Sequence, residues 1–286
     1  MRKLSLRHVT RYLYPQPAQF LPHRLFLRPR EGHDVRIVSS RLRIEPDCTV
    51  VWHRDACGNS VAVATFSAAS DTLSIVSEVA LEHYEEVSDD WPLEAYADSF
   101  PFQYDAAERL ELTPYQQLLF AREDQALRSW VSGFWQPGDR VPTTELLKRM
   151  NEAIAARMIY VRREEPGVQR PSQTLAMGSG SCRDFATLFM ETCRFLGVAA
   201  RFVSGYLHAP GLPAVAGATH AWTEVYLPGA GWRGYDSTTG DMTGGDHIPV
   251  AVSRHPESVP PVAGAFAGGG YGVPQMEVEV AVRLRA

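Results

Sequence analysis

The sequence predicts an α+β protein in which an all-β module precedes a domain of helices and antiparallel strands. Apolar and polar side chains alternate in short runs over residues 1–85, which is the pattern of half-buried strands. Helical periodicity replaces this alternation after residue 103 and continues to about residue 196, where the alternation returns. Because the first stretch is all strand and the second mixes both patterns, we expect a separate β module.

Residues 1–85 are predicted to form a small β-sandwich or barrel, because regularly spaced short strands without helical periodicity are typical of such modules. The first strand covers residues 4–12, and turn-forming prolines follow it at Pro15 and Pro17. Four further strands are expected at 35–44, 49–53, 60–66 and 72–81.

Residues 86–103 are acidic and aromatic, so they are predicted to be a linker to a second domain over residues 104–250. Residues 251–286 are predicted to be a Gly- and Pro-rich segment that ends in a strand at 276–284. Residues 240–273 as a whole are expected to be irregular, because Gly and Pro recur through them.

In the second domain, helices are predicted first and strands after them. One helix is expected to begin at a cap formed by Thr143 or Thr144. Another covers residues 182–196, and Gly197 ends it. Strands are then expected at Arg201–Leu207, Ala218–Leu227 and Trp232–Asp236.

Composition excludes several classes of protein. A net charge of −5 gives no basic footprint for nucleic acid or an anionic membrane. No apolar run is long enough for a membrane span, and the N-terminus lacks the apolar core of a secretory signal. Four cysteines in a chain of this length do not make a disulfide framework, so we expect a cytoplasmic protein.

Cys182 is the first candidate for chemistry, because it follows a Gly/Ser-rich loop and opens an apolar helix. The positive end of a helix and a neighbouring imidazolium both favour a thiolate, and the loop can present amide N–H groups to an oxyanion. A lone cysteine at a helix start is more often structural. Cys193, in the same helix, lies among apolar residues and is predicted to be a core residue.

His220 and Asp236 strengthen the case for Cys182. The two residues lie on successive predicted strands whose midpoint, Pro228, falls in the turn, so a hairpin brings them toward one end of the sheet. A four-residue loop would place Asp236 opposite Thr223, three positions short of His220, and a bulge or strong twist would have to close that gap. A Cys–His–Asp order on a helix and two strands suits nucleophilic catalysis.

Four stretches resemble bacterial transglutaminase-like proteins, which are relatives of the papain-fold thiol enzymes. They are Gly180–Ala186, Leu196–Leu207, His220–Tyr226 and Gly231–Thr238. The first 85 residues resemble the β-rich region that precedes the catalytic domain in many bacterial members, notably at Leu25–Arg30 and Asp55–Asn59. The resemblance implies a papain/transglutaminase-like core, in which the helix that bears the cysteine packs on an antiparallel sheet.

The resemblance also implies a role for each site residue. Cys182 would be the nucleophile, His220 the general base and acid, and Asp236 the carboxylate that orients the histidine, while Asp184 would make a structural hydrogen bond. This chain departs from the family at Ser237, where proline is frequent. It also departs at Asp34, where many relatives carry glutamine.

We expect hydrolysis of an amide or peptide bond in a protein or peptide substrate, without a cofactor. Acyl transfer to an amine, which is transglutaminase chemistry, uses the same triad and stays open. A non-catalytic peptide-binding module is a third possibility, against which the intact Cys–His–Asp set argues. The β module is expected to pack on the catalytic domain, joined by the C-terminal strand, and to shape access to the cleft.

Three other groups of residues are weaker candidates. Cys48, His53 and Cys57 lack the spacing of a zinc finger, so no metal site is expected there. The glycines at 268–270 are not a phosphate loop, because no Lys-Ser/Thr follows them. Asp241, Asp246 and His247 form a polar cluster that is expected to be solvated, or to border the substrate cleft.

Overall fold

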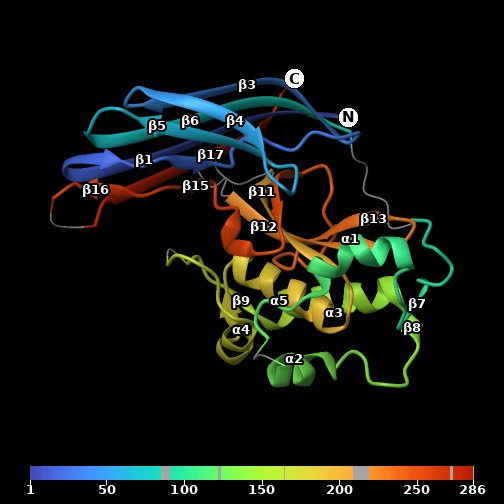
Figure 1. The fold of residues 1–286 in the computed structure, drawn as a ribbon. Helices are drawn as coiled ribbons and strands as arrows, with labels where there is room; N and C mark the ends of the chain where they lie inside the picture. The colour runs from blue at the N-terminus through green and yellow to red at the C-terminus, as the bar shows by residue number, and fades with distance from the viewer. Residues whose placement is uncertain (85–90, 122–123, 164, 209–218, 271–272, 286) are drawn as a thin grey trace.

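The computed structural model describes residues 1–286 except 85–90, 122–123, 164, 209–218, 271–272 and 286. Figure 1 shows a β-rich unit stacked on a helical unit, with the strands β11 and β12 between them. Both ends of the chain lie at the β-rich unit, where Arg285 N–H donates to the Lys3 carbonyl. The predicted α+β class is confirmed. No helix among the described residues is long and apolar enough to cross a membrane.

The β-rich unit is a sandwich of two antiparallel sheets. One sheet has the order β16-β1-β6-β3, with β17 also paired to β1, and the other has the order β15-β2-β5-β4. Apolar side chains of both sheets, including Phe20, Leu25 and Ile75, meet between them and form a core. Its strands are β1 (Arg2–Phe20), β2 (His23–Leu25), β3 (Val35–Glu45), β4 (Cys48–Arg54), β5 (Ser60–Phe66), β6 (Ser70–His83), β15 (Val262–Ala263), β16 (Phe266–Gly268) and β17 (Gln275–Leu284).

Strand β1 corrects one expectation. The prolines at 15 and 17 were predicted to end the strand, but β1 continues to Phe20. The pairing of β1 with β6 shifts register between Leu13 and Ala18, so both prolines fall inside an irregularity where no regular ladder hydrogen bond is required of them.

The helical unit is built around α5 (Cys182–Phe195) and a sheet with the order β13-β12-β11-β14. The sheet strands are β11 (Ala200–Leu207), β12 (Thr219–Leu227), β13 (Gly231–Tyr235) and β14 (His247–Ser253). The remaining helices are α1 (Ala106–Gln116), α2 (Asp124–Val131), α3 (Thr143–Arg157), α4 (Pro171–Met177) and the 3-10 turn η2 (Pro256–Ser258). Two short strand pairs complete the unit: β7 (Ser99–Phe100) with β8 (Val141–Pro142), and β9 (Ile159–Tyr160) with β10 (Ser179–Gly180).

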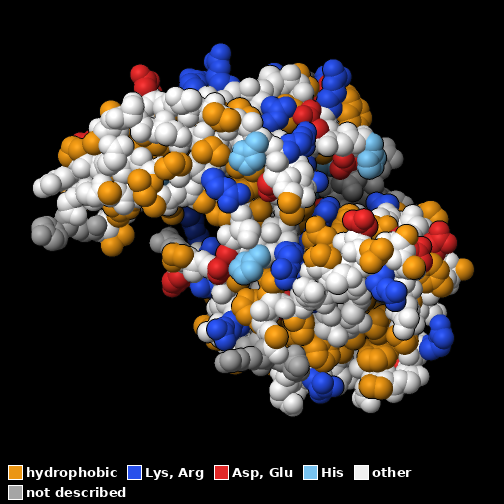
Figure 2. Space-filling model, in the orientation of Figure 1, with side chains coloured by type: hydrophobic (Ala, Val, Ile, Leu, Met, Phe, Trp, Pro, Cys, Tyr) orange, Lys and Arg blue, Asp and Glu red, His pale blue; other side chains and the backbone are white. Residues whose placement is uncertain are grey.

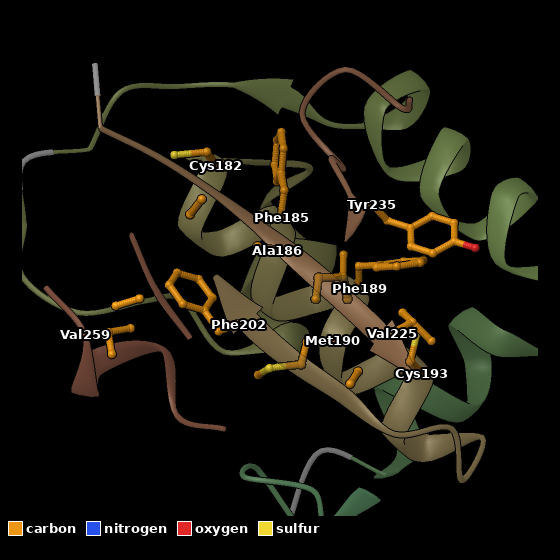
Figure 3. Packing of buried hydrophobic residues seen from close by; sticks show 14 of the residues in the cluster. Cys182, Phe185, Ala186, Phe189, Met190, Cys193, Phe202, Val225, Tyr235 and Val259 are labelled. Carbon is orange, nitrogen blue, oxygen red and sulfur yellow. The ribbon is translucent and has the colours of Figure 1, made fainter. Parts of the chain in front are cut away.

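Helix α5 is buried over almost its whole length against the sheet. Figure 3 shows Phe185, Phe189 and Met190 of this helix packed behind strand β12. The hydroxyl of Thr223, on β12, donates to the carbonyl of Ala186 at 2.8 Å and ties strand to helix. Because α5 is held along its length, its first residue has a fixed position relative to the end of β12.

Three expectations about the helical unit are corrected. Helix α3 begins at Thr143 after Pro142, with no side-chain cap; the Thr143 hydroxyl donates instead to the Ala97 carbonyl. Residues 240–273 were expected to be irregular, but within them β14 pairs with β11 inside the central sheet, and β15 and β16 join the sandwich. The sequence of β14, HIPVAVS, is apolar between its first and last residues. The glycines on either side of it hide this pattern in the sequence. Helix α4 was not anticipated. The expected strand start at Ala218 and residues 86–90 of the linker lie outside the described residues.

The β sandwich packs on the face of the central sheet that α5 leaves open. The side-chain amide of Asn59 donates to the Val252 carbonyl at 2.8 Å and its oxygen accepts from the Val252 N–H at 2.9 Å. His8 and the Tyr206 hydroxyl are 2.7 Å apart in the buried interface. The two units therefore share buried polar contacts as well as apolar packing, and Figure 2 shows the surface hollowed where the sandwich overhangs the helical unit.

Candidate active site

Cys182 is the first residue of α5 and its side chain is buried, with a relative exposure of 8%. Ser181 caps the helix together with Asp184 in a reciprocal capping box. Gly180 has no room for a side chain, because a Cβ there would lie 2.9 Å from the Cβ of Asp184. Figure 3 shows the sulfur of Cys182 directed away from the labelled core side chains.

Asp184 holds the loop that leads to the cysteine. Its carboxylate is fully buried and accepts from the Ser181 N–H and hydroxyl, both at 2.8 Å, and from the Gln169 N–H and Arg163 guanidinium, both at 2.7 Å. Burial opposes ionisation, but these donors outweigh it and hold the pKa of Asp184 below its usual value. These four hydrogen bonds join Asp184 to Ser181, Gln169 and Arg163, so Asp184 has a structural role in this geometry.

His220 lies next to the start of β12 and contacts both other site residues. Its Nε2 donates to Oδ2 of Asp236 at 2.6 Å, and the nearby Cys182 side chain also raises the pKa of the ring. Because Nε2 is committed to Asp236, Nδ1 is the ring nitrogen left for exchange of a proton with Cys182. The structure therefore brings Cys182, His220 and Asp236 together in the order expected from the sequence.

The hairpin is tighter than a four-residue loop. Leu227 pairs with Gly231, so Tyr235 rather than Asp236 lies opposite Thr223. Asp236 follows β13 at the level of Trp222, two positions from His220 instead of three. The remaining gap is closed where the chain leaves β13, and no bulge is needed within the β12–β13 ladder.

Asn151, on α3, holds the loop after Asp236 in place. The side-chain amide of Asn151 donates to the carbonyls of Asp236 and Asp241, at 3.4 and 3.0 Å, and accepts from the Ser237 hydroxyl at 2.7 Å. Asp236 itself is fully buried, and its Oδ1 accepts from the Thr238 N–H at 2.9 Å. Ser237, one of the departures from the family, thus contributes a hydrogen bond that proline could not make.

Electrostatics favour an ion pair between His220 and Asp236. Burial alone lowers the pKa of His220, but its hydrogen bonds to Asp236 and Cys182 outweigh burial and raise that pKa to about 10. Burial likewise opposes ionisation of Asp236, yet its hydrogen bonds to His220 and His247 hold the pKa of this carboxyl well below its usual range. At neutral pH the pair is imidazolium and carboxylate.

His247 is a site residue that the sequence analysis did not single out for a role. It begins β14, and its Nε2 lies 3.1 Å from Oδ2 of Asp236, the same oxygen that accepts from His220. Its ring packs edge-on against Trp222, with centroids 5.3 Å apart. The available signal was a histidine directly before the run Ile248–Ser253, which indicates a strand that opens with a polar residue.

Within the residues that the structure describes, the side chains of the other two members of the expected polar cluster make no hydrogen bond or ion pair with the Asp236 carboxylate. Asp246 pairs with Arg2 of the sandwich and with His208 at 2.8 Å. Asp241 contributes its backbone to the loop beyond Asp236. Cys57 packs against Val203, Trp222 and Val252 rather than against Cys48.

His220, Asp236 and His247 form the one group of possible metal ligands found in the described part of the chain. Ligands on a tetrahedral zinc ion, at about 2.0–2.1 Å from the metal, lie about 3.3 Å from one another. The two nitrogens here are 2.6 and 3.1 Å from the carboxylate oxygen, which is hydrogen-bond spacing. The group therefore fits a hydrogen-bonded network better than a metal centre.

A cavity adjoins the site on the sandwich side of the sheet. His247 and Trp222 form part of its wall, together with Asp34, Glu224 and Trp91. Glu224 is held by Arg201 at 2.6 Å. Asp34, the second departure from the family, belongs to the sandwich, so both units line this cavity.

Two family models match this chain. Residues 136–237 match the transglutaminase-like superfamily, and residues 4–82 match the bacterial transglutaminase-like N-terminal region. The chain thus combines a transglutaminase-like superfamily core with a bacterial transglutaminase-like N-terminal region. The resemblance noted in the sequence is confirmed for both parts of the chain.

Individual proteins are also similar to this chain. An uncharacterised protein of Mycobacterium tuberculosis is 28% identical over 279 residues, which cover 92% of this chain and 87% of that protein. An uncharacterised protein of Mycobacterium leprae is 38% identical over 96 residues, 32% of this chain and 33% of its own length. A crystal structure from Cytophaga hutchinsonii, named a “Putative Cysteine Protease”, has a TM-score of 0.77 at 16% identity and covers 99% of this chain and 90% of its own. At that identity it shows a shared fold.

Proposed function

We propose that this transglutaminase-like chain is a cysteine hydrolase that cleaves an amide or peptide bond through a thioester on Cys182. In this proposal His220 is the general base and acid, and Asp236 orients it. The observation that carries the proposal is the place of the His220 ring between the other two residues: Nε2 donates to Asp236 at 2.6 Å, and Cys182 lies close enough to raise the pKa of the same ring. A thiol, an imidazole and a carboxylate in this order supply what nucleophilic acyl transfer needs.

The reaction has two halves. The sulfur attacks the acyl carbon, a C–S bond forms, and the C–N bond breaks as His220 gives its proton to the departing nitrogen. Water then gives a proton to His220 and attacks the thioester, the C–S bond breaks, and the acid leaves. Asp236 stays ionised throughout and stabilises the imidazolium.

The start of α5 supports the first half of the reaction. The helix N-terminus favours negative charge on sulfur, and the protonated His220 ring adds a second positive charge beside it. The N–H of Cys182 is the first of the helix and has no intrahelical partner, so we assign it as one donor to the oxyanion.

Water is the proposed acyl acceptor, because it reaches any open thioester, whereas transfer to an amine needs a surface that holds the amine. The test is intact-mass spectrometry after incubation with a library of glutamine- and amide-containing peptides, with and without a primary amine. Wild type is compared with Cys182→Ala, and Cys193→Ala serves as a matched thiol control. Cleavage or deamidation that needs Cys182 and occurs without amine incorporation is the expected result.

Other outcomes would redirect the proposal. Incorporation of the amine that needs Cys182 would make the chain a transglutaminase. Peptide binding without turnover, together with a native Cys182 that iodoacetamide alkylates no faster than Cys48, would make it a peptide-binding module. Both results would reject hydrolysis.

A further inference from the structure

We propose that His247 is a positioning residue for the reaction: its neutral ring donates Nε2–H to Asp236 and holds the carboxylate in place for His220. The inference rests on the proposed function, because it concerns the same triad. It adds a fourth side chain from β14, a strand that lies at the opposite edge of the sheet from β13.

The tautomer of His247 follows from its second contact. The Gly244 N–H donates to Nδ1 of His247 at 3.3 Å, so Nδ1 carries no proton. A ring with an unprotonated Nδ1 must carry its proton on Nε2, and Nε2 faces Oδ2 of Asp236 at 3.1 Å. His247 is therefore a neutral donor to the carboxylate and does not compete with His220 as a cation.

Asp236 needs this donor because it is fully buried. A buried carboxylate is costly unless hydrogen bonds satisfy its oxygens. Its Oδ1 has the Thr238 N–H, and its Oδ2 has the two imidazoles. Without His247, Oδ2 would depend on His220 alone, and the carboxylate plane would be fixed by fewer contacts.

Packing holds the three rings in one arrangement. The His220 and His247 centroids are 6.0 Å apart, and each ring also lies against Trp222, at 6.2 and 5.3 Å. Trp222 is itself pressed onto Gly205, where an added Cβ would lie 2.5 Å from its ring. His247 therefore cannot turn away from Asp236 without displacing a buried tryptophan.

The sandwich fixes the backbone of His247. His83, at the end of β6, donates from Nε2 to the His247 carbonyl at 3.1 Å, and the Arg30 N–H donates to the Pro249 carbonyl at 2.8 Å. These two hydrogen bonds hold the backbone of β14 on either side of Ile248. The β module thus contacts β14, and β14 carries the His247 imidazole that contacts Asp236.

The test needs the charged groups around His247 to be kept constant. Those that face it from neighbouring elements are Asp236, His220, His83, Asp34, Glu224 and Arg233. Two substitutions leave all of them in place and separate the contacts of the ring. His247→Gln keeps a donor near the Nε2 position, and His247→Asn keeps an acceptor near Nδ1 for the Gly244 N–H.

The readout is the rate at which iodoacetamide alkylates Cys182 in the folded protein, followed by peptide mass spectrometry from pH 5 to pH 9. We expect His247→Gln to stay within about twofold of wild type. His247→Asn should react about tenfold more slowly at pH 6, because the buried Asp236 carboxylate loses one of the two donors on its Oδ2. The difference should shrink toward pH 9, where ordinary thiols, with a pKa of about 8.5, are deprotonated.

The outcomes separate the two proposals. An alkylation profile of His247→Asn that overlays wild type overturns the positioning role, and so does a His247→Gln profile as slow as that of His247→Asn. A merely structural role would lower the free energy of unfolding of a variant without changing its pH profile. A wild-type Cys182 that reacts no faster than Cys48 would instead overturn the proposed function, and this inference with it.

Discussion

Cys182 and Cys193 lie at opposite ends of α5, and the surroundings of the two thiols differ sharply. Cys182 contacts an imidazole and borders a capped helix start. Cys193 is fully buried among core side chains, and burial raises the pKa of its thiol far above the usual value. In the proposed function, the same residue type on one helix thus serves reaction at one end and packing at the other.

The buried charged residues at the two ends of α5 also differ in what they bind. Near Cys182, the Asp184 carboxylate accepts hydrogen bonds from the Ser181 N–H, in the loop before the cysteine, and from the Gln169 N–H. Near Cys193, Glu191 and Arg194 form a fully buried ion pair at 3.1 Å, and Arg194 also donates to the Ala200 carbonyl. The surroundings of each thiol therefore depend on the loop and strand that meet its helix end, and not on the helix alone.

The largest expected effect is on turnover. Cys182→Ala should lower kcat by at least about 10⁴-fold, because members of a catalytic triad act as a unit. Cys193→Ala should leave kcat within about threefold, since its thiol lies away from the triad. Both are measured on the peptide that the mass-spectrometric screen identifies. Residual cleavage by Cys182→Ala at a tenth of the wild-type rate would remove the contrast between the two ends.

Next is the stability of the loop before α5. Asp184→Ala should lower the free energy of unfolding by about 3 kcal/mol, because it leaves Arg163 and three other donors without their acceptor. The control is Glu145→Ala, which removes an exposed first-turn carboxylate of α3 and should cost less than about 1 kcal/mol. Urea unfolding followed by circular dichroism measures both, and equal losses would contradict the role of Asp184.

The pH dependence of stability tests the His220–Asp236 pair. The folded-state pKa of His220 is raised from 6.5 to about 10, so its contribution is full below pH 6.5 and is lost as pH rises through about 10. Relative to His220→Gln, wild type should lose up to about 5 kcal/mol of unfolding free energy across this window, because each unit of pKa difference is worth about 1.4 kcal/mol. The exposed His33→Gln variant should follow wild type. Parallel curves for wild type and His220→Gln would show that the two side chains are not paired.

The smallest effect concerns packing at the far end of α5. Cys193→Ala should lower the free energy of unfolding by about 1 kcal/mol, because it opens a small cavity in a fully buried core. Cys182→Ala should change it by less, since its sulfur points away from that core. Denaturant midpoints of the two variants give the comparison, and a larger loss for Cys182→Ala would reverse it.

Much of this fold could be predicted from sequence, because its strands and α5 carry strong local patterns. The predicted strands at 35–44 and 60–66 match β3 and β5, and Gly197 ends α5 in the left-handed conformation that glycine favours. Strand β14 could not be recognised in the same way. It is short and buried within a Gly- and Pro-rich stretch, and it forms because β11 and Asn59 supply its hydrogen-bond partners.

By itself the sequence determined the α+β class, the family resemblance, and the three residues Cys182, His220 and Asp236. Local periodicity and motif spacing carry that information, because neighbours in sequence are neighbours on one strand or helix. Only the tertiary structure decided the tighter hairpin register, the place of β14, and the contact of His247 with Asp236. These features join segments far apart in the chain, and no local pattern encodes which buried carboxylate a distant imidazole will meet.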